Sequence, residues 1–326
     1  MTMYYQKNGP TLKSLEPQPV HLPSDRITYM KLAAVTMIWG GTFVAGRYLS
    51  AAIDPLLAAS LRFLLASLAL LAFMGLARIP LARPSPRQMA QLVMLGFFGI
   101  FFYNLCFFYG LQYINASRAS LIVALNPAVI GLASWWLFKD RLNTSKILGI
   151  ALCLTGAALV IVSRNPQVLS EATNTWRGDL LIVGCVVGWS VYSLFSRGLN
   201  QRLGPLQTVT WSILMGTVML TATTLIMGRF SVEAIGSLHA PQVLSLVYLG
   251  VLGSALAYIG YYDGIRQIGA TRSGVFIALN PLTAVISGAL LLGEPLTAPM
   301  LAGGAVILLG IYLCNKPLAR ARALGI

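Results

Sequence analysis

Apolar segments of about 20 residues recur along the whole chain and are separated by short polar connections. The core of a bilayer is about 30 Å thick and takes about 20 apolar residues per helix, so each such segment predicts a transmembrane helix. Ten segments meet this criterion: 30–49, 56–76, 90–112, 117–138, 145–163, 179–199, 206–227, 242–264, 272–292 and 299–315. Runs such as LASLALLAFMGL do not alternate apolar and polar residues, which excludes a transmembrane β-barrel. We therefore predict an all-α membrane protein with ten transmembrane helices.

The composition agrees with this prediction. Apolar residues make up 57% of the chain and charged residues 10%, which is too little polar material to cover a soluble globule of 326 residues. The net charge of +14 would suggest nucleic acid in a soluble protein, but here the informative property is where the basic residues fall. The partners that we predict are the lipid bilayer and a small-molecule substrate, with no nucleic acid, and the protein is expected to be a monomer or a homodimer.

The basic residues lie mainly in alternate connections. With a cytoplasmic amino terminus, 17 of the 23 Lys and Arg fall in cytoplasmic segments, five fall in outer segments, and Arg62 lies within a span. The positive-inside rule therefore places both termini in the cytoplasm, which agrees with an even number of helices. The first 27 residues are polar and contain four prolines, so they predict a disordered cytoplasmic tail and not a signal peptide.

Two halves of the chain share co-linear landmarks. The tetrapeptide ALNP occurs twice at an offset of 154 residues, which aligns Asn126 with Asn280, and at an offset of 150 residues Trp39 aligns with Trp189. Each half holds five predicted helices, an odd number, so the second half enters the membrane from the opposite side. Inverted repeats of this kind are typical of secondary transporters.

This repeat divides the chain into five parts. They are a disordered cytoplasmic tail (1–27), a first five-helix repeat (28–164), an outer linker (165–177), a second five-helix repeat (178–315) and a basic cytoplasmic tail (316–326).

Each repeat carries an Asn-Pro pair near the middle of a predicted span. Pro127 and Pro281 have no N–H group and crowd the carbonyl four residues earlier, so each helix is expected to kink and to leave a backbone acceptor free. A free acceptor in hydrocarbon must be satisfied by protein or line a cavity. A kink that serves only helix packing is the alternative, but the matched positions favour two hinges beside a substrate path.

The sequence resembles the EamA-type transporters of the drug/metabolite superfamily over nearly all of residues 30–315. The resemblance is carried by WGGTFVAGR (39–47), PLLAASLRF (55–63), the first ALNP segment, GDLLIVGCVVGWSVYSLFSR (178–197) and the stretch from YYDGIRQIGATRSGVFIALNP through LLGEPL (261–296). It implies ten helices in two inverted repeats, a bacterial inner membrane location, and export of amino acids or other metabolites. The first repeat departs from the second at KDR (139–141), which stands where the second has GEP (293–295).

Catalytic motifs are not found in the sequence. It contains no H-E-x-x-H, G-x-S-x-G, Walker A or G-x-G-x-x-G motif, and its two histidines, His21 and His239, lie in a predicted tail and a loop. The four cysteines lie in predicted spans without metal-ligand spacing, so we interpret them as packing residues. We predict no enzyme activity, no cofactor and no metal site.

Aromatic and amide side chains are the main polar groups within the spans. In a cavity they would stack a flat substrate and hydrogen-bond its polar edge. The alternative is that they form the aromatic belts found at membrane interfaces, but most lie far from the span ends. The substrate-binding candidates are Trp39, Thr42, Tyr103, Asn104, Asn126, Trp189, Tyr192, Tyr258, Tyr262 and Asn280.

Three charged residues near or within the spans are candidates for function. Arg62 lies about 12 Å deep at 1.5 Å per residue, where it neutralises a substrate carboxylate, pairs with Glu294 or caps a broken helix. Asp263 and Glu294 are the candidates for a proton-coupling acid, although both lie near span ends. Facilitated diffusion or exchange is therefore as compatible with the sequence as proton antiport.

Glycines recur every seven residues in the last span of each half. Gly149 and Gly156 align with Gly303 and Gly310, and such spacing lets helix backbones approach closely. We predict that these glycines hold the two repeats together, and a dimer seam is the alternative.

The sequence thus predicts a secondary transporter for small metabolites, and amino acids are the leading substrate class. The alternatives are an efflux pump for lipophilic compounds in the same fold and, from another class, a membrane receptor or assembly subunit without transport.

Overall fold

The computed structural model describes residues 25–140, 142–164, 176–283, 286 and 297–316. Within these ranges, nine helical segments are long and apolar enough to cross a membrane: Arg26–Ser50, Pro55–Leu76, Pro86–Tyr113, Arg118–Phe138, Thr144–Ser163, Trp176–Arg202, Pro205–Ile226, Ala240–Ile268 and Ala298–Asn315. Each overlaps one of the ten predicted spans. The remaining predicted span, 272–292, lies partly outside the described residues, so the count of ten stays a prediction.

Several spans are built from more than one helical element. The helices up to residue 164 are α1 (Asp25–Ser50), α2 (Pro55–Leu76), α3 (Pro86–Gly96), η1 (Phe97–Phe102), α4 (Tyr103–Tyr113), α5 (Ala116–Val123), α6 (Asn126–Phe138) and α7 (Thr144–Arg164). After it come α8 (Trp176–Phe195), α9 (Arg197–Arg202), α10 (Pro205–Ile226), α11 (Val232–Gly236), α12 (Ala240–Val247), η3 (Tyr248–Leu256), α13 (Ala257–Ile268), α14 (Ala270–Gly274), η4 (Val275–Ala278) and α16 (Ala298–Asn315).

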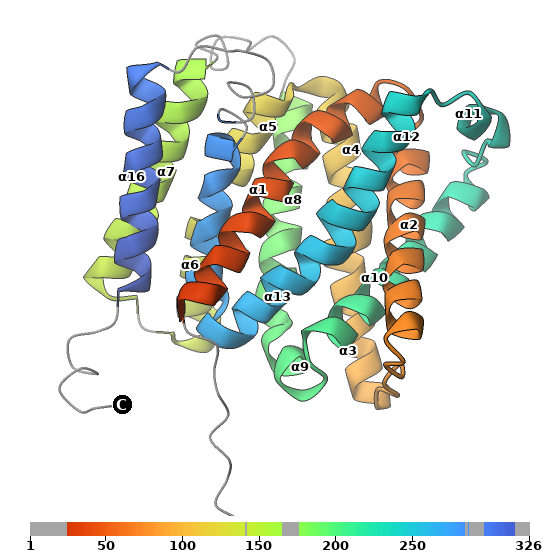
Figure 1. Ribbon diagram of the computed structural model, residues 1–326, viewed down its shortest axis with the longest axis horizontal. Helices are drawn as coiled ribbons and strands as arrows, with labels where there is room; N and C mark the ends of the chain where they lie inside the picture. Colours follow the sequence, from red (N-terminus) through yellow and green to blue (C-terminus); the bar gives the residue numbers. More distant parts are fainter. Residues whose placement is uncertain (1–24, 141, 165–175, 284–285, 287–296, 317–326) are drawn as a thin grey trace, which may run out of the picture.

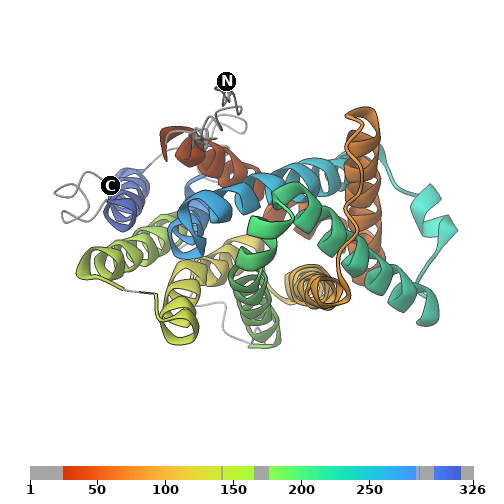
Figure 2. The same cartoon turned by 90° about the horizontal axis from the view of Figure 1, so that it is seen from below.

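The helices form one bundle in which α7 and α16 lie side by side at one end and α11 lies at the other (Figures 1 and 2). The start of α1 and the end of α13 lie at the lower edge of the view in Figure 1, and the end of α4 and the start of α5 lie at the upper edge. This places the ends of the spans at two opposite faces of the bundle, which we call the lower and the upper face.

Elements at corresponding positions of the two halves pack in equivalent pairs. α1 packs on η3 and α13, and α8 packs in the same way on η1 and α4. α2 packs on α10, where the Ser67 and Thr217 hydroxyls, 150 residues apart, share a hydrogen bond of 2.9 Å. Hydrogen bonds between small polar side chains are a common means of joining helices in a membrane. Each half is therefore held largely by contacts with the other.

Local sequence explains where several spans begin. The Asp54 carboxylate accepts hydrogen bonds from two backbone N–H groups in the first turn of α2, which starts at Pro55. Ser85 forms a capping box with Gln88 at the start of α3. These residues satisfy the N–H groups that a helix leaves unpaired in its first turn, and proline at the first position has no N–H group to lose.

The glycines at the seam between α7 and α16 allow the two backbones to touch. A Cβ atom added to Gly149 would lie 2.6 Å from the Gly310 carbonyl oxygen, and one added to Gly156 would lie 2.7 Å from that of Gly303. Both distances are shorter than any contact a real Cβ atom makes with backbone. The structure confirms the prediction that these glycines join the two halves by close helix packing.

We predict that Gly149→Ala lowers the thermal unfolding midpoint of the detergent-purified protein. The added methyl group meets backbone atoms of α16, which cannot rotate away, so the substitution is expected to cost about 1–3 kcal/mol of stability. Gly75→Ala in α2 is the matched control, because a Cβ atom there meets nothing within 4 Å. Equal midpoints for the two variants would show that the seam tolerates separation of the helices.

Candidate functional site

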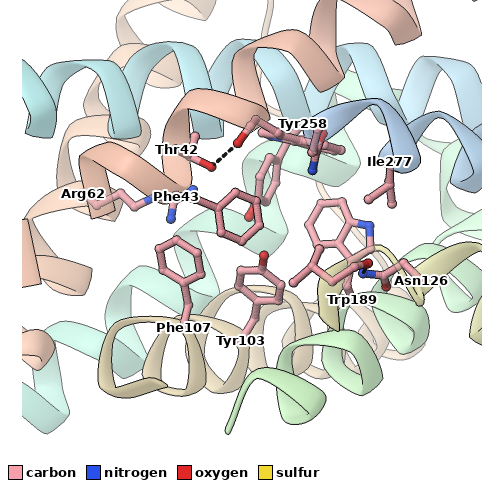
Figure 3. A pocket seen from close by; sticks show the side chains of 12 residues that line it. Thr42, Phe43, Arg62, Tyr103, Phe107, Asn126, Trp189, Tyr258 and Ile277 are labelled. Carbon is pink, nitrogen blue, oxygen red and sulfur yellow. Dashed lines mark hydrogen bonds between the residues drawn. The ribbon is translucent and has the colours of Figure 1, made fainter. Parts of the chain in front are cut away.

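A pocket lies inside the bundle, between elements from both halves of the chain (Figure 3). Its lining comes from α1, α2, α4, α5, α6, α8, α13, η4 and the turn that follows η4. The lining residues are Trp39, Thr42, Phe43, Arg62, Tyr103, Phe107, Val123, Asn126, Trp189, Tyr258, Ile277 and Asn280. In Figure 3, Arg62 and Phe107 lie on one side of this central pocket, Trp189 and Asn126 lie on the other, and Tyr103 lies between them.

The central pocket is small. Its cavity volume is about 30 Å³, and a water molecule needs about 10–15 Å³ by the same measure. The pocket therefore has room for about two water molecules and is too small for a metabolite. The structure represents a contracted conformation, and any larger molecule must move the helices or side chains around it.

Arg62 is a buried cation that has no acidic partner among the described residues. Its side chain is 3% exposed, and it donates hydrogen bonds to Ser254 Oγ at 2.9 Å and to Asn104 Oδ1 at 3.1 Å. The guanidinium also lies 5.2 Å from the centre of the Phe63 ring and 5.8 Å from that of Phe107. These neutral groups orient the guanidinium, but they do not cancel its charge, which is costly at this depth in a membrane.

Four aromatic residues form a cluster in the lining of the central pocket. The Trp39 and Trp189 rings meet edge to face with centres 5.0 Å apart, and Tyr258 lies 5.2 Å from Trp189. Tyr103 lies 5.7 Å from Trp189 and extends the wall toward α4. The matched tryptophans of α1 and α8 thus meet each other at the centre of the bundle.

The two tryptophans differ in their hydrogen bonds. Trp39 Nε1 donates to the carbonyl oxygen of Gly253 at 2.9 Å, within the π-helical segment η3. π-Helical turns leave carbonyl groups without their usual partner and often occur at functional sites. Trp189 Nε1 faces the Tyr261 hydroxyl but has no partner at hydrogen-bond distance among the described residues. Trp39 is therefore held in place by hydrogen bonding, whereas the donor of Trp189 remains available.

The first Asn-Pro pair stands at a break between two helices. α5 ends at Val123, and α6 begins at Asn126 with Pro127 in its first turn. The side chain of Asn126 donates from Nδ2 to the Val123 carbonyl oxygen at 2.8 Å, which is the acceptor that the proline was expected to leave free. Asn126 Oδ1 is buried and accepts no hydrogen bond among the described residues. This oxygen is available to a molecule in the central pocket.

The second Asn-Pro pair also follows an interruption of the α-helix. The residues of η4 (Val275–Ala278) form a 3-10 helix, after which Asn280 and Pro281 lie in a helical turn. Asn280 Oδ1 is buried without a hydrogen-bond donor among the described residues, as in the first copy. The Asn280 backbone approaches α1 so closely that a Cβ atom at Gly40 would lie 2.8 Å from its carbonyl oxygen.

Seven of the ten predicted substrate-binding residues line the central pocket, and three do not. Asn104 lies behind Arg62, where it accepts from the guanidinium and donates to the Ile100 carbonyl oxygen at 2.7 Å. Tyr192 and Tyr262 lie behind Trp189, with ring centres 4.8 Å apart, and the Tyr192 hydroxyl shares a hydrogen bond of 2.9 Å with Ser212. These three residues lie outside the lining of this conformation, because helical spacing predicts a shared face but not its full contact with a cavity, and their role in substrate binding stays a prediction.

Four lining residues were not predicted from the sequence. Phe43, Phe107, Val123 and Ile277 complete the apolar part of the wall. Phe43 follows Thr42 directly, and Val123 and Ile277 are the residues whose carbonyls the two prolines crowd. The last two had a signal in the sequence, whereas nothing distinguished the two phenylalanines from other apolar residues in their spans.

The acidic candidates lie away from the central pocket or outside the described residues. Asp263 forms an ion pair with Lys31 at 3.2 Å near the lower face, and its side chain is 26% exposed. Glu294 lies outside the described residues. The central pocket therefore contains one charged residue, Arg62, among those that the structure describes.

Matched arginines close the bundle at both faces. At the upper face, Arg118 of α5 forms two hydrogen bonds of 2.7 Å to the carboxylate of Asp179 in α8. At the lower face, Arg272 of α14 donates to the Tyr29 hydroxyl in α1 and to Asn315 in α16. The upper cluster contains the Arg118–Asp179 ion pair, and the lower cluster joins α14 to α1 and α16 through Arg272.

The nine long apolar helices of the described residues and the pocket between elements of the two halves are the features of a multi-span membrane protein. The chain belongs to the EamA-like transporter family, which matches it twice, over residues 26–162 and 176–316. This match confirms the resemblance found in the sequence. The proteins similar to it are described as transporters, and they indicate no catalytic function.

Several relatives cover almost the whole chain. An uncharacterized transporter of Archaeoglobus fulgidus is 28% identical over 87% of this chain and 97% of its own length. A probable amino-acid metabolite efflux pump of Salmonella typhimurium is 26% identical over 86% of this chain and 91% of its own length. A solved crystal structure with 21% identity superposes with a TM-score of 0.73 over 90% of this chain and all of the other, which shows a shared fold.

We predict that Trp39→Phe lowers the thermal unfolding midpoint more than Trp189→Phe does. Both substitutions remove an indole of similar burial, but only the first removes a hydrogen bond of normal length, which contributes about 0.5–1.5 kcal/mol. Each variant thus serves as the control for the other. A larger loss in Trp189→Phe would contradict the assigned difference in hydrogen bonding.

Proposed function

We propose that the protein is a secondary transporter that moves amino acids or closely related small metabolites across a bacterial inner membrane by alternating access. The observation that carries this proposal is the buried charge of Arg62, which faces a polar pocket between the two halves without an acidic partner among the described residues. A substrate carboxylate in the central pocket supplies the missing negative charge. Binding then repays part of the cost of burying the guanidinium.

The remaining polar groups of the central pocket favour a substrate that also carries hydrogen-bond donors. Asn126 Oδ1 and Asn280 Oδ1 are buried acceptors without donors among the described residues, and Arg62 and Asn126 lie on opposite sides of the pocket (Figure 3). A molecule that reaches both sides carries a carboxylate at one end and hydrogen-bond donors, such as an ammonium group, toward the other. The tryptophan and tyrosine rings between them fit an apolar or aromatic spacer. Aromatic amino acids combine these features.

The closed ends support alternating access. Arg118 and Asp179 join α5 to α8 at the upper face, and Arg272 joins α14 to Tyr29 of α1 at the lower face. In a cycle that exposes the central pocket to one face at a time, one cluster opens while the other stays closed. The broken helices at Asn126 and Asn280 are the hinges that we propose for this exchange, with the two halves arranged as inverted repeats.

Export is the direction that the relatives favour, because the Salmonella typhimurium protein is named a probable amino-acid metabolite efflux pump. Efflux of lipophilic compounds is the second candidate. A pump of that kind is expected to have a cavity rich in Met and Phe, whereas the described lining contains two phenylalanines, no methionine, and Arg62 at its edge. The polar lining therefore favours a charged metabolite as the substrate.

We predict that the purified protein in proteoliposomes shows saturable counterflow of a radiolabelled aromatic amino acid, and that Arg62→Met reduces it at least about tenfold. A charge-assisted hydrogen bond contributes about 1.5–3 kcal/mol, and 1.4 kcal/mol is a tenfold change in binding. Arg62→Lys, which keeps the charge, is expected to retain part of the flux.

The thermal unfolding midpoint separates loss of transport from loss of the fold. Arg62→Met is expected to unfold close to the wild-type temperature, because it removes a buried charge together with its cost. Wild-type counterflow by a folded Arg62→Met variant would contradict the role of Arg62. If lipophilic cations and not amino acids exchange, the second candidate is correct.

A second prediction concerns the upper cluster. Asp179→Asn removes the charge of a bidentate ion pair, so it is expected to open the upper face more often. The measurement is the rate at which a membrane-impermeant maleimide modifies Thr42→Cys in the central pocket, with and without Asp179→Asn. Asp140→Asn, which removes an ion pair to Arg197 elsewhere, is the control. Equal rates in all backgrounds would show that the Arg118–Asp179 pair does not hold the pocket closed.

A further inference from the structure

A second hollow, which we call the lower groove, lies on the outside of the bundle between α1, α13 and the start of α10. Its volume is about 490 Å³, against about 30 Å³ for the central pocket. The wall is almost entirely apolar, and Lys31 and Asp263 are its charged members. The other lining residues are Ala34, Val35, Ile38, Pro205, Leu206, Leu256, Ile259 and Gly260.

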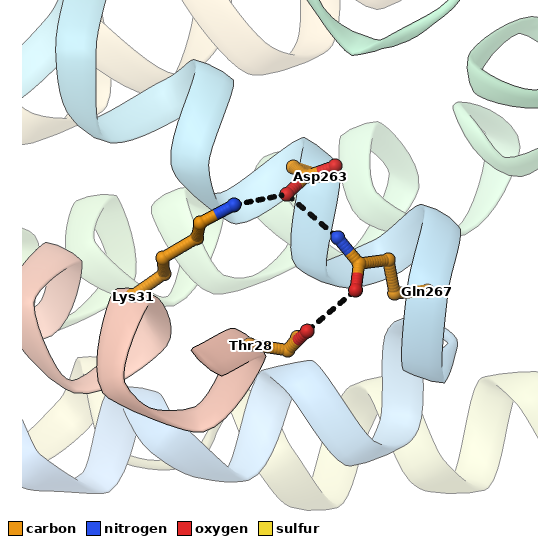
Figure 4. A network of polar contacts seen from close by, with 4 residues as sticks. All are labelled: Thr28, Lys31, Asp263 and Gln267. Atoms are coloured by element: carbon orange, nitrogen blue, oxygen red, sulfur yellow. Dashed lines mark hydrogen bonds and ion pairs between the residues drawn. The ribbon is translucent and has the colours of Figure 1, made fainter. Parts of the chain in front are cut away.

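The charged residues of the lower groove belong to a polar network that joins α1 to α13 (Figure 4). Lys31 Nζ lies 3.2 Å from Asp263 Oδ2, which also accepts a hydrogen bond of 2.8 Å from Gln267 Nε2. Thr28 donates to Gln267 Oε1 at 2.5 Å. The side chains of Lys31 and Asp263 are 48% and 26% exposed, so both remain accessible from the groove.

Each charged group keeps unused hydrogen-bonding capacity. Asp263 Oδ1 accepts no hydrogen bond among the described residues, because both of its contacts there are made by Oδ2. The Lys31 ammonium has three N–H donors, and within the described chain it uses one of them, on Asp263. The pair therefore presents one acceptor of negative charge and two donors of positive charge, side by side.

The position of the lower groove fits the depth of a phospholipid. Lys31 is five residues from the start of its span at Arg26, and Asp263 is five residues from the end of its span at Ile268. Both residues therefore lie about 7.5 Å from the same face of the bundle at 1.5 Å per residue. The apolar wall continues from there to Ile38 and Leu256, about 10 Å further along both helices. The polar end of the lower groove thus lies at the level of the lipid headgroups, and its apolar part lies at the level of the acyl chains.

We propose that the lower groove binds one acyl chain of a phosphatidylethanolamine molecule, whose headgroup lies across the Lys31–Asp263 pair. The lipid phosphate accepts hydrogen bonds from Lys31, and the lipid ammonium donates to Asp263 Oδ1. The headgroup then matches the charge pair with opposite signs at both positions, which is electrostatic complementarity between two zwitterionic groups. This inference does not depend on the transport function proposed above.

The same geometry discriminates between phospholipids. The trimethylammonium group of phosphatidylcholine carries a charge but has no N–H donor for Asp263. The glycerol headgroup of phosphatidylglycerol is neutral, so its lipid offers a phosphate to Lys31 and no cation to Asp263. The lower groove is therefore expected to prefer phosphatidylethanolamine over both, and the preference arises at Asp263.

A bound lipid here would touch the helices that close the central pocket. α1 carries Trp39 and α13 carries Tyr258, and both residues lie within two turns of the upper end of the lower groove. A phospholipid wedged between α1 and α13 thus stabilises the packing of two helices from opposite halves. Lipid occupancy is expected to raise the thermal unfolding midpoint.

Native mass spectrometry of the delipidated full-length protein, with the three phospholipids added at equal concentration and with the same acyl chains, tests the proposal. The wild-type protein is expected to retain about tenfold more phosphatidylethanolamine than phosphatidylcholine, as one charge-assisted hydrogen bond provides. Asp263→Asn, which keeps the shape of the side chain and removes its charge, is expected to lose this preference. The thermal unfolding midpoint should rise with phosphatidylethanolamine in the wild type and not in Asp263→Asn.

Two further variants separate the parts of the site. Ala34→Phe fills the lower groove while leaving Lys31 and Asp263 in place, so it is expected to lose retention of phosphatidylethanolamine. Asp140→Asn breaks the ion pair with Arg197, whose side chains are 35% and 36% exposed, and is expected to keep the preference. Equal retention of the three lipids by the wild type, or an unchanged preference in Asp263→Asn, overturns the proposal. Displacement of the lipid by an amino acid would assign the lower groove to the substrate instead.

Discussion

The need to satisfy every backbone polar group in hydrocarbon determines where this bundle can break its helices. Proline at 127 frees the carbonyl of Val123, and the preceding asparagine side chain returns a hydrogen bond to it at 2.8 Å. One end of the Asn126 amide is thereby used for the backbone, which leaves its oxygen directed to the pocket. The same dipeptide thus breaks the helix, satisfies the carbonyl that the break leaves free and supplies a polar group to the central pocket.

Matched positions in the two halves have acquired different roles. Trp39 uses its indole N–H to hold η3, whereas the N–H of Trp189 is left without a direct partner in the described structure. Arg118 faces a carboxylate in α8, and Arg272 faces a phenol and an amide. The two arginines therefore have different neighbours, a carboxylate at the upper face and a phenol and an amide at the lower face.

The sequence predicts the spans well because the thickness of the bilayer fixes their length and their apolarity. It also places Arg62 within a span, where a charge requires an explanation, and it marks the Asn-Pro breaks. The sequence pattern does not predict contacts between residues that are distant along the chain. The pairing of Arg62 with Asn104 and Ser254 depends on how α2, α4 and η3 meet, and no local pattern encodes that. Tyr192 was assigned to the pocket for the same reason: spacing shows which residues share a face but not where the face ends.

The small volume of the central pocket and the lack of an acidic partner for Arg62 among the described residues together affect the stability of this conformation. With about 30 Å³ of space, the central pocket excludes all but a few water molecules, so Arg62 is poorly solvated. Its charge is held by two neutral oxygen atoms and two aromatic rings. This arrangement is less stable than one with a carboxylate or with bulk water beside the guanidinium. Opening toward either face or binding an anionic substrate both relieve it. A buried cation of this kind therefore favours transitions between conformations, as the alternating access that we propose requires.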